Sequence, residues 1–255
     1  MGRLDGQVAW ICGASGAIGA ETSRVLAREG ARVVLSSRNT QALDRLAGEI
    51  AQSGAPAPLA IATDISQRAQ VDAAIARIER ECRRVDILVN SVAITTFGDF
   101  LELADEDWLA VLQAKQLGYV RTMRAVLPLM LRQGGGRIVN VSGRGGHQPT
   151  TFAHFPGCSA NAAVNLLTKG ISLRYGADGI RANAVAPGPV SSGRYDQLAA
   201  ANAAVNTSST PVVKTSARKG EPADIADIIA FLVSDASRHL NGIVVQADGG
   251  GTTTL

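Results

Sequence analysis

The sequence predicts a single α/β domain built on a doubly wound parallel sheet, and two observations carry this prediction. Short apolar segments rich in β-branched residues alternate with stretches of helical periodicity along the chain. Nearly all of the short segments are apolar throughout, as expected of strands that helices cover on both faces. Because regular strand–helix alternation requires crossover connections, the strands are expected to run parallel.

The pattern places seven strands and six helices in alternating order. The strands are predicted at Val8–Cys12, 33–35, 59–63, Ile87–Asn90, 138–141, 180–185 and 243–246. The helices are predicted at Ala17–Arg28, Thr40–Gln52, 67–83, 106–131, 161–175 and 223–233. Residues 191–220, rich in Ser, Thr, Ala and Asn, fit neither pattern. We interpret them as a mobile, lid-like insertion or a disordered loop within one domain that spans residues 1–255.

Composition excludes several classes of protein. The 255 residues are 46% hydrophobic, which is enough for one large core, and the net charge of +3 with no basic cluster disfavours nucleic-acid binding. The three cysteines, Cys12, Cys82 and Cys158, fit neither a disulfide framework nor a zinc site. No signal-peptide core precedes the first strand, and no apolar run reaches the roughly 18 residues of a membrane span. We therefore expect a cytoplasmic protein with no metal and no membrane contact.

A glycine-rich loop follows the first predicted strand and opens the first predicted helix. Gly13, Gly16 and Gly19 form a Gly-x-x-x-Gly-x-Gly pattern with Ser15 and Ile18 between them. Glycines permit a tight turn and let the backbone approach a pyrophosphate, whose negative charge a helix N-terminus favours. The strand–loop–helix context is the one that this motif requires, so these five residues are expected to bind a dinucleotide.

This glycine spacing and five later segments resemble the short-chain dehydrogenase/reductase family over almost the whole chain. The segments are residues 85–90 (VDILVN), 136–142 (GRIVNVS), 180–190 (IRANAVAPGPV), and the pair 220–226 (GEPADIA) and 247–250 (ADGG). The resemblance implies a Rossmann-like fold, a nicotinamide cofactor and a small-molecule substrate. It also implies a homo-oligomer, either a dimer or a tetramer.

Cofactor choice is predicted from the end of the second strand. Members of this family that prefer NAD carry an acidic residue there, which binds the ribose hydroxyls and would repel a 2′-phosphate. Ser37 takes the acidic position here, and Arg38 follows it. Since a guanidinium holds a phosphate through two N–H donors, these residues predict NADP(H) in preference to NAD(H).

The resemblance implies further cofactor contacts after other strands. Asp64 and Ile65 match the adenine contact of the family. Residues 90–93 (NSVA) stand where the family usually has Asn-Asn-Ala-Gly, so Asn90, Ser91 and Ala93 are expected to line the adenosine ribose and the nicotinamide approach. The segment after the sixth strand adds Pro187, Gly188 and Val190.

The usual catalytic tetrad of the family, Asn-Ser-Tyr-Lys, is not recognisable. The chain contains no Tyr-x-x-x-Lys motif, and its three tyrosines are Tyr119, Tyr175 and Tyr195. In family members the phenol exchanges a proton with the substrate oxygen, and the lysine lowers the pKa of the phenol. Alignment through the helix predicted at 161–175 puts other residues at the four tetrad positions. These are Lys115 for Asn, Gly143 for Ser, Gly157 for Tyr and Asn161 for Lys.

Two of these differences are linked in our interpretation. Lysine is missing at position 161 and present at 115, whereas asparagine shows the reverse. Lys115 shares one helical stripe with apolar residues (Trp108, Val111, Leu112, Gly118 and Tyr119), which directs it to the interior. We therefore predict that Lys115 delivers an ammonium to the cavity from the opposite wall, close to Asn161. The alternative is a lysine that extends to solvent from the helix surface.

The candidates for the missing phenol, His147, His154 and Cys158, lie in the loop after the fifth strand and at its end. His154 precedes Gly157 by three residues and could reach the vacated space, and an imidazole suits proton transfer near neutral pH. Ser142 or Arg144 could replace the serine. Cys158 is more simply a small buried residue.

Three functions remain open from the sequence. The first is an NADP(H)-dependent carbonyl reductase or alcohol dehydrogenase with a remodelled proton relay, with Lys115, Ser142, His154 and Asn161 as catalytic candidates. The second is a lyase, isomerase or dehydratase without net redox chemistry. The third is a non-catalytic NADP(H)-binding protein.

Overall fold

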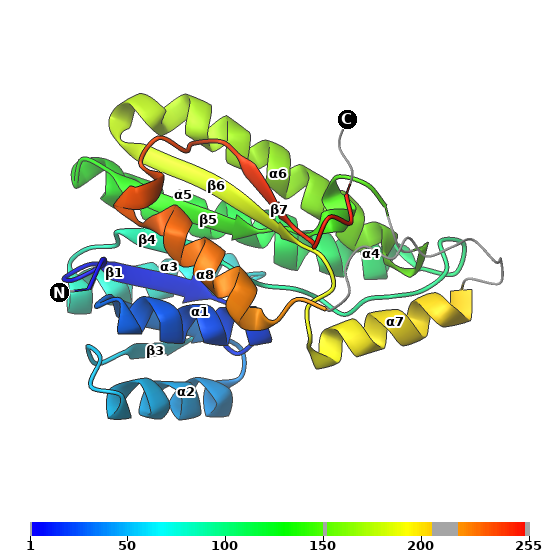
Figure 1. The fold of residues 1–255 in the computed structure, drawn as a ribbon, viewed down its shortest axis with the longest axis horizontal. Coiled ribbons are helices and arrows are strands. Elements are labelled where there is room, and N and C mark those ends of the chain that lie inside the picture. Colours follow the sequence, from blue (N-terminus) through cyan, green and yellow to red (C-terminus); the bar gives the residue numbers. More distant parts are fainter. Residues whose placement is uncertain (1, 150–151, 206–218, 253–255) are drawn as a thin grey trace.

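A parallel sheet of seven strands forms the centre of the molecule (Figure 1). The computed structural model describes residues 2–149, 152–205 and 219–252. The strands are β1 (Val8–Cys12), β2 (Arg32–Ser37), β3 (Leu59–Ala62), β4 (Ile87–Asn90), β5 (Gly136–Val141), β6 (Ile180–Pro187) and β7 (Val244–Ala247). Their order in the sheet is β3-β2-β1-β4-β5-β6-β7. The predicted doubly wound parallel sheet is confirmed.

Helices cover both faces of the sheet (Figure 1). They are α1 (Ala17–Arg28), α2 (Thr40–Gln52), α3 (Arg68–Cys82), α4 (Asp105–Val111), α5 (Leu117–Arg132), α6 (Phe155–Tyr175), α7 (Gly193–Val205) and α8 (Pro222–Val233). Apolar residues of α1, α2 and α8 pack in one core cluster, and those of α3, α5 and α6 pack in the other. The chain therefore forms three layers, with the sheet buried between two layers of helices.

Strand β1 shows why continuous apolar runs become central strands. All five of its residues are buried, because β1 pairs with β2 on one side and β4 on the other and carries helices on both faces. Trp10 is fully buried, and its Nε1–H donates a hydrogen bond of 2.8 Å to Ser36 Oγ on β2. The one polar atom of this large side chain is thus satisfied within the core.

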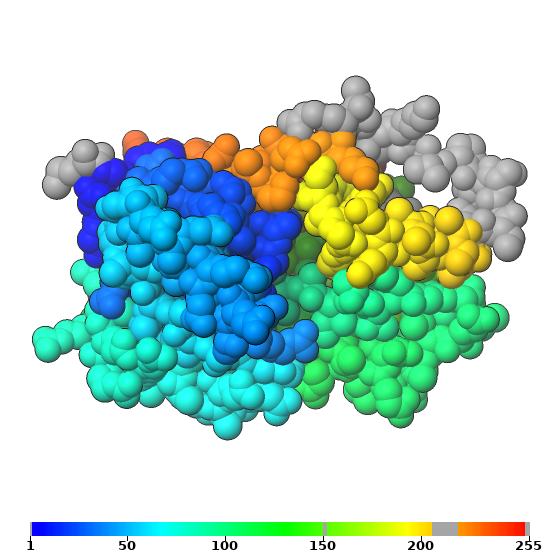
Figure 2. All heavy atoms as spheres, turned by 90° about the horizontal axis from the view of Figure 1, so that it is seen from below, coloured from blue at the N-terminus to red at the C-terminus, as the bar shows by residue number. Residues whose placement is uncertain are grey.

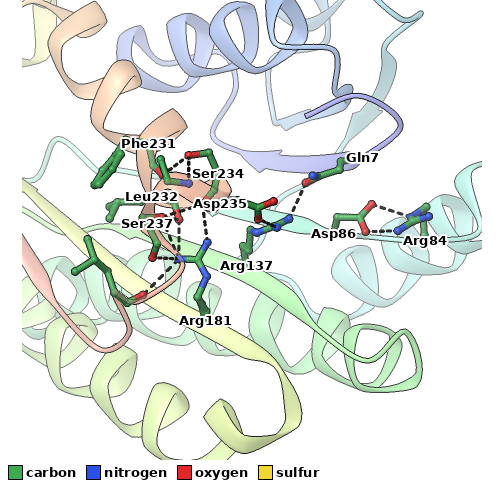
Figure 3. Close-up of polar contacts among 12 residues, drawn as sticks. Gln7, Arg84, Asp86, Arg137, Arg181, Phe231, Leu232, Ser234, Asp235 and Ser237 are labelled. Carbon is green, nitrogen blue, oxygen red and sulfur yellow. Dashed lines mark hydrogen bonds and ion pairs between the residues drawn. The ribbon is translucent and has the colours of Figure 1, made fainter. Parts of the chain in front are cut away.

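Polar side chains at the amino ends of the strands tie the sheet to helix α8 (Figure 3). Nη1 of Arg181, the second residue of β6, lies 3.1 Å from Leu232 O and 3.0 Å from Ser237 O, and its Nη2 lies 3.0 Å from Ser234 O. Arg137 on β5 forms an ion pair of 2.6 Å with Asp235. Carbonyls at a helix C-terminus have no partner within the helix, so Arg181 satisfies groups that the helix leaves free.

Three segments differ from the sequence-based prediction. Helix α6 begins at Phe155, earlier than the expected residue 161, with Pro156 in its first turn, where the missing N–H of proline costs nothing. The helix expected at 106–131 is interrupted by a π-helical turn at Leu112–Gln116. The stretch 191–220 includes helix α7, while its residues 206–218 lie outside the described ranges. Its mobility stays a prediction.

Two further observations concern the predicted class of protein. Within the described ranges, no helix is both long and apolar enough to cross a membrane. Cys12, Cys82 and Cys158 are all free thiols.

Candidate active site and cofactor cleft

A large cleft opens at the carboxyl ends of the strands. Its volume is about 1620 Å³, and its walls include the loops after β1, β2, β3, β4, β5 and β6, together with helix α7. Figure 2 shows a recess between the N-terminal segment in blue and α7 in yellow. Loops at this edge of a parallel sheet converge on one place, so ligands of such folds bind there.

The glycine loop forms a cradle that no side chain fills. Gly13 has a φ of +88°, and a Cβ at this position would lie 2.5 Å from the carbonyl oxygen of Ser91. A Cβ at Gly19 would lie 2.2 Å from the carbonyl oxygen of Gly13. Helix α1 begins after Gly16 with no side-chain cap and no acidic residue in its first turn. Its N-terminal N–H groups therefore remain available to an anion.

The predicted phosphate-binding residues lie on the wall formed by the loops after β2 and β3. Ser37, Arg38, Asp64 and Ile65 all line the cleft. Arg38 is exposed, and no ion pair among the described residues involves it. The Ser37 hydroxyl lies close to the backbone of Asn39, with Asn39 N donating to Ser37 Oγ at 3.1 Å.

The structure separates the remaining predicted cofactor residues into two groups. Those on the cleft wall, beside Gly13 and Gly16 of the loop, are Ser15, Ile18, Ser91, Ala93, Pro187, Gly188 and Val190. Gly19 and Asn90 are not on the wall. Asn90 is fully buried, where its Nδ2 donates to Asn140 Oδ1 at 2.9 Å and its Oδ1 accepts from Thr122 Oγ1 at 2.8 Å. Asn90 therefore braces β4 against β5 and α5.

Lys115 points into the molecule from the π-helical turn. Its side chain is buried and lines the cleft, and its Nζ donates a hydrogen bond of 3.1 Å to Ser142 O. The alternative of a lysine extending to solvent is therefore wrong. Burial, followed by the positive charge of Arg194, lowers the pKa of Lys115 to about 7, against a smaller opposing effect of Cys158. An ammonium with such a pKa exchanges its proton readily at neutral pH.

Asn161 and Lys115 lie on either side of the turn that follows β5. A Cβ at Gly143 would lie 2.7 Å from Asn161 Nδ2, so the Asn161 amide fills the space beside this glycine. Asn161 Oδ1 is buried and has no hydrogen-bond partner in the described part of the chain. No direct hydrogen bond joins Lys115 to this amide. The lysine bonds instead to the carbonyl of Ser142, whose hydroxyl lies 3.3 Å from Val185 O.

The imidazole of His154 occupies the space next to Gly157. A Cβ at Gly157 would lie 2.0 Å from two atoms of this ring, so a tyrosine and His154 in its present position exclude each other. His154 Nε2 lies 3.1 Å from Arg194 Nη2. Because a guanidinium only donates, Nε2 must accept, and the ring proton therefore sits on Nδ1. Burial, Arg194 and Lys115 lower the pKa of His154 to about 4.

Arg194 completes this cluster and was missed by the sequence analysis. It is the second residue of α7 and lines the cleft, with its guanidinium carbon 5.4 Å from the centre of the Phe97 ring. The available signal was its isolation, since it is the only arginine between Arg181 and Arg218. The predicted residues Lys115, Ser142, His154 and Asn161 do all line the same cleft.

Comparison with known proteins identifies the family. A family model described as enoyl-(acyl carrier protein) reductase matches residues 13–252. The oxidoreductase UcpA of Salmonella typhimurium is 33% identical over 256 residues, which covers 99% of this chain and 97% of that protein. The chain belongs to the short-chain dehydrogenase/reductase family.

Solved structures agree with this assignment to the short-chain dehydrogenase/reductases. A gluconate 5-dehydrogenase from Burkholderia cenocepacia, in complex with NADP and tartrate, superposes with a TM-score of 0.89 at 30% identity and covers 99% of this chain and 98% of its own. An NAD⁺-bound xylitol dehydrogenase gives a TM-score of 0.91 at 25% identity, covering 97% and 99%. The protein is thus an oxidoreductase of this family, which acts on alcohol and carbonyl groups of small molecules.

The cleft fits the nicotinamide dinucleotide of a short-chain dehydrogenase/reductase. The cradle at Gly13 is closed to any side chain, and the uncapped N-terminus of α1 adjoins it. The unpartnered Oδ1 of Asn161 is a free acceptor at the other end of the cleft. These features suit a pyrophosphate and a sugar hydroxyl, respectively.

Proposed function

We propose that the protein is an NADP(H)-dependent carbonyl reductase or alcohol dehydrogenase whose proton donor is Lys115. The observation that supports this most is the buried Lys115 ammonium on the cleft wall, with its pKa lowered to about 7. Family members use a phenol for this step, and Gly157 stands at the position of that tyrosine. The relay is therefore remodelled rather than lost.

The described part of the chain offers no equivalent phenol beside Lys115. Tyr119 is the nearest tyrosine, with its ring centre 5.8 Å from Lys115 Nζ. It is fully buried, and its hydroxyl lies 3.0 Å from Val92 O and 3.1 Å from Val141 O. Burial raises the pKa of Tyr119, so this phenol holds its proton and serves the core. Tyr195 lines the cleft on α7 and serves below as a test of the assignment.

Lys115 has the geometry of a proton donor that is held in place. Its bond to Ser142 O fixes the direction of the side chain, and the remaining ammonium protons are available to a substrate oxygen in the cleft. In reduction, Lys115 gives a proton to the oxygen that becomes the alcohol. In oxidation, the neutral amine takes that proton back.

His154 and Asn161 position the reacting groups in this mechanism. With a pKa near 4, His154 is neutral at pH 7 and cannot supply an acidic proton, so its role is to hold Arg194 through Nε2. Asn161 Oδ1 is a buried acceptor suited to a ribose hydroxyl of the cofactor. Ser142 contributes its carbonyl to Lys115.

The cofactor we propose is NADP(H). Arg38 is an exposed guanidinium on the cleft wall beside Ser37, with no carboxylate to repel a 2′-phosphate. Gly13, Gly16 and the N-terminus of α1 would hold the pyrophosphate. When bound, the reduced cofactor supplies a hydride to the carbonyl carbon.

We also propose a homo-oligomer, as the family resemblance implies. Large apolar side chains stay exposed on α4, α5 and α6, namely Leu109, Leu117, Leu166 and Leu173. Clustered apolar exposure of this kind is costly in a monomer. Light scattering at micromolar concentration should therefore give a multiple of the 26.4 kDa chain, and a monomer would contradict the proposal.

A screen of carbonyl compounds tests the function. Absorbance of NADPH should fall with at least one aldehyde or ketone, and calorimetric titration should show tighter binding of NADPH than of NADH. Lys115→Met should fold and bind NADPH but turn over slowly. If NADPH binds and no carbonyl or alcohol reacts in either direction, a non-redox or non-catalytic role takes the place of the proposed one.

A further inference from the structure

Arg194 is a charged group at the catalytic end of the cleft that the proposed reaction does not use. Its guanidinium is largely buried, and burial lowers its pKa. In the described part of the chain, Arg194 makes two hydrogen bonds, both from Nη2, to Ile94 O at 3.4 Å and to His154 Nε2 at 3.1 Å. Its Nε–H is buried and has no partner among the described residues.

No carboxylate in the described part of the chain compensates the charge of Arg194. None of the ion pairs found there includes it. The acidic residues described on the cleft wall form no hydrogen bond or ion pair with Arg194. Asp64 accepts from Ser66 N, Asp224 from Glu221 N, and Asp248 Oδ1 from Gly250 N, while Asp248 Oδ2 is buried without a partner among the described residues. The residues outside the described ranges contain no Asp or Glu. Removing an unpaired charge from water is unfavourable, so a ligand is the natural source of the compensating charge.

The neighbours of Arg194 add to the positive character of this end of the cleft. The positive charge of Arg194 lowers the pKa of Lys115, and the charges of Arg194 and Lys115 together lower the pKa of His154. Phe97 lies against Arg194 and packs edge-on against His154, with ring centroids 4.9 Å apart. The arginine thus contacts the Phe97 ring and the His154 imidazole, while its Nε and Nη1 make no hydrogen bond to a described residue.

We propose that the substrate carries a carboxylate that binds Arg194, and that the carbonyl or alcohol group of the same molecule faces Lys115. A guanidinium binds a carboxylate through its N–H donors, and Nη1 of Arg194 makes no hydrogen bond to a described residue. The substrate class is then an oxo acid or hydroxy acid. This inference rests on the proposed function only for the reaction and not for the binding.

The phosphates of the cofactor are an alternative source of negative charge for Arg194, but the order of the strands places their binding site away from Arg194. The glycine loop follows β1 and Arg38 follows β2, whereas the neighbours of Arg194 follow β4 and β5, as Ile94 and His154 do. His154 also fills the space of the tyrosine side chain at position 157, where family members bind the substrate oxygen. Arg194 therefore belongs to the substrate end.

Calorimetric titration of the NADP⁺-saturated protein with malonate, and with uncharged malonamide, tests the binding. Malonate should bind and malonamide should not. Arg194→Gln should weaken malonate binding at least tenfold, and Arg194→Lys should weaken it less. Arg174→Gln, which removes an equally charged but exposed side chain, should change malonate binding less than twofold. Affinity for NADPH should stay within twofold in all variants.

Two results would overturn the inference. One is malonate binding that is equal in wild type and Arg194→Gln. The other is a loss of NADPH affinity in Arg194→Gln with malonate binding unchanged, which would assign the arginine to a cofactor phosphate.

A kinetic comparison separates this inference from the proposed function. If neutral ketones are reduced and Arg194→Gln leaves their kcat/KM and that of oxo acids unchanged, the carboxylate site is refuted and the reductase stands. If malonate binding depends on Arg194 but no oxo acid is reduced, the carboxylate site stands and the reductase fails.

Discussion

Two partly buried arginines, one at each end of the sheet, differ in how completely the fold satisfies their donors. At the amino ends of the strands, Arg181 has acceptors for its Nη1 and Nη2 groups, and it bonds to the carbonyls that end α8 (Figure 3). At the carboxyl ends, Arg194 keeps a buried Nε–H without a partner. Both side chains are charged and removed from much of the solvent, so the difference lies in how completely the fold satisfies them.

The same contrast holds for other polar groups. Eight buried side-chain atoms lack a hydrogen-bond partner in the described part of the chain, and five of them belong to residues on the cleft wall, which are His154, Asn161, Arg194, Gln246 and Asp248. The fold satisfies buried polar groups almost everywhere else, as stable proteins must. Unsatisfied groups gathered in one cleft show where the protein gives up stability for binding and chemistry.

The largest expected effect is on turnover, from changing Lys115 in the cleft at the carboxyl ends of the strands. Lys115→Met should lower kcat about 10²- to 10⁴-fold, the usual contribution of a positioned acid or base. In wild type, kcat for reduction should fall as pH rises through about 7, because the ammonium is the acid and exists below its pKa. Stopped-flow or steady-state pH profiles measure both effects.

Tyr195→Phe is the control for Lys115→Met. This variant should keep the wild-type pH profile, since the proposal gives the tyrosine hydroxyl no role in proton transfer. A pH dependence lost in Tyr195→Phe and kept in Lys115→Met would assign the proton donor to Tyr195.

At the amino ends of the strands, the expected effect is on stability. Arg181→Ala removes the donors for several carbonyls around the end of α8 and should lower the free energy of unfolding by about 3 kcal/mol. Arg238→Ala, at a nearby exposed position, should change it by less than about 0.5 kcal/mol. Urea denaturation of the cofactor-free protein measures both, and similar values for the two variants would refute the contrast.

The buried lysine should also make stability depend on pH. Its pKa in the folded protein is about 7, below the ordinary lysine value of 10.5. Between these values the unfolded chain binds more protons than the folded one, so unfolding free energy should rise with pH, at up to about 1.4 kcal/mol per unit. Cys12 and Tyr119 have raised pKa values, which change the free energy of unfolding with pH in the opposite direction. The difference in free energy of unfolding between wild type and Lys115→Met, taken at each pH, removes their contribution and leaves that of Lys115. A difference that stays flat from pH 7 to 10 would contradict it.

Cofactor preference gives a smaller effect. Arg38→Ala should weaken NADPH binding about tenfold, the value of one charged contact, and leave NADH binding unchanged. Arg45→Ala, on the exposed surface of α2, is the matched control and should alter neither. Equal affinity of wild type for both cofactors would remove the basis of the NADP(H) assignment.

The smallest effect sharpens the comparison of the two arginines. Arg194→Gln should leave the free energy of unfolding unchanged or raise it by less than about 1 kcal/mol, because it removes an incompletely satisfied buried charge. Arg181→Gln should be clearly destabilising in the same assay. Equal losses in both variants would mean that Arg194 stabilises the fold as Arg181 does.

Most of the fold was predictable because its signals are local. The strand-like runs and the helices α1 and α2 have the bounds or nearly the bounds that periodicity indicates. The errors fall where tertiary contacts override local pattern. Helix α7 packs beside the residues before α6, with Phe152 N donating to Asn202 Oδ1, and its composition alone indicated a loop. The π-helical turn around Lys115 has no sequence signature that we used.

The sequence by itself determined the family, the glycine cradle, the Ser37–Arg38 pair and the absence of a Tyr-x-x-x-Lys motif, because each is a short pattern read along the chain. Only the tertiary structure shows which side chains lie around the position of that motif. The contacts of Lys115 with Ser142 and of His154 with Arg194 join residues 27 and 40 positions apart. Burial and the proximity of like charges set the pKa of Lys115, and both depend on how distant segments pack rather than on residue type.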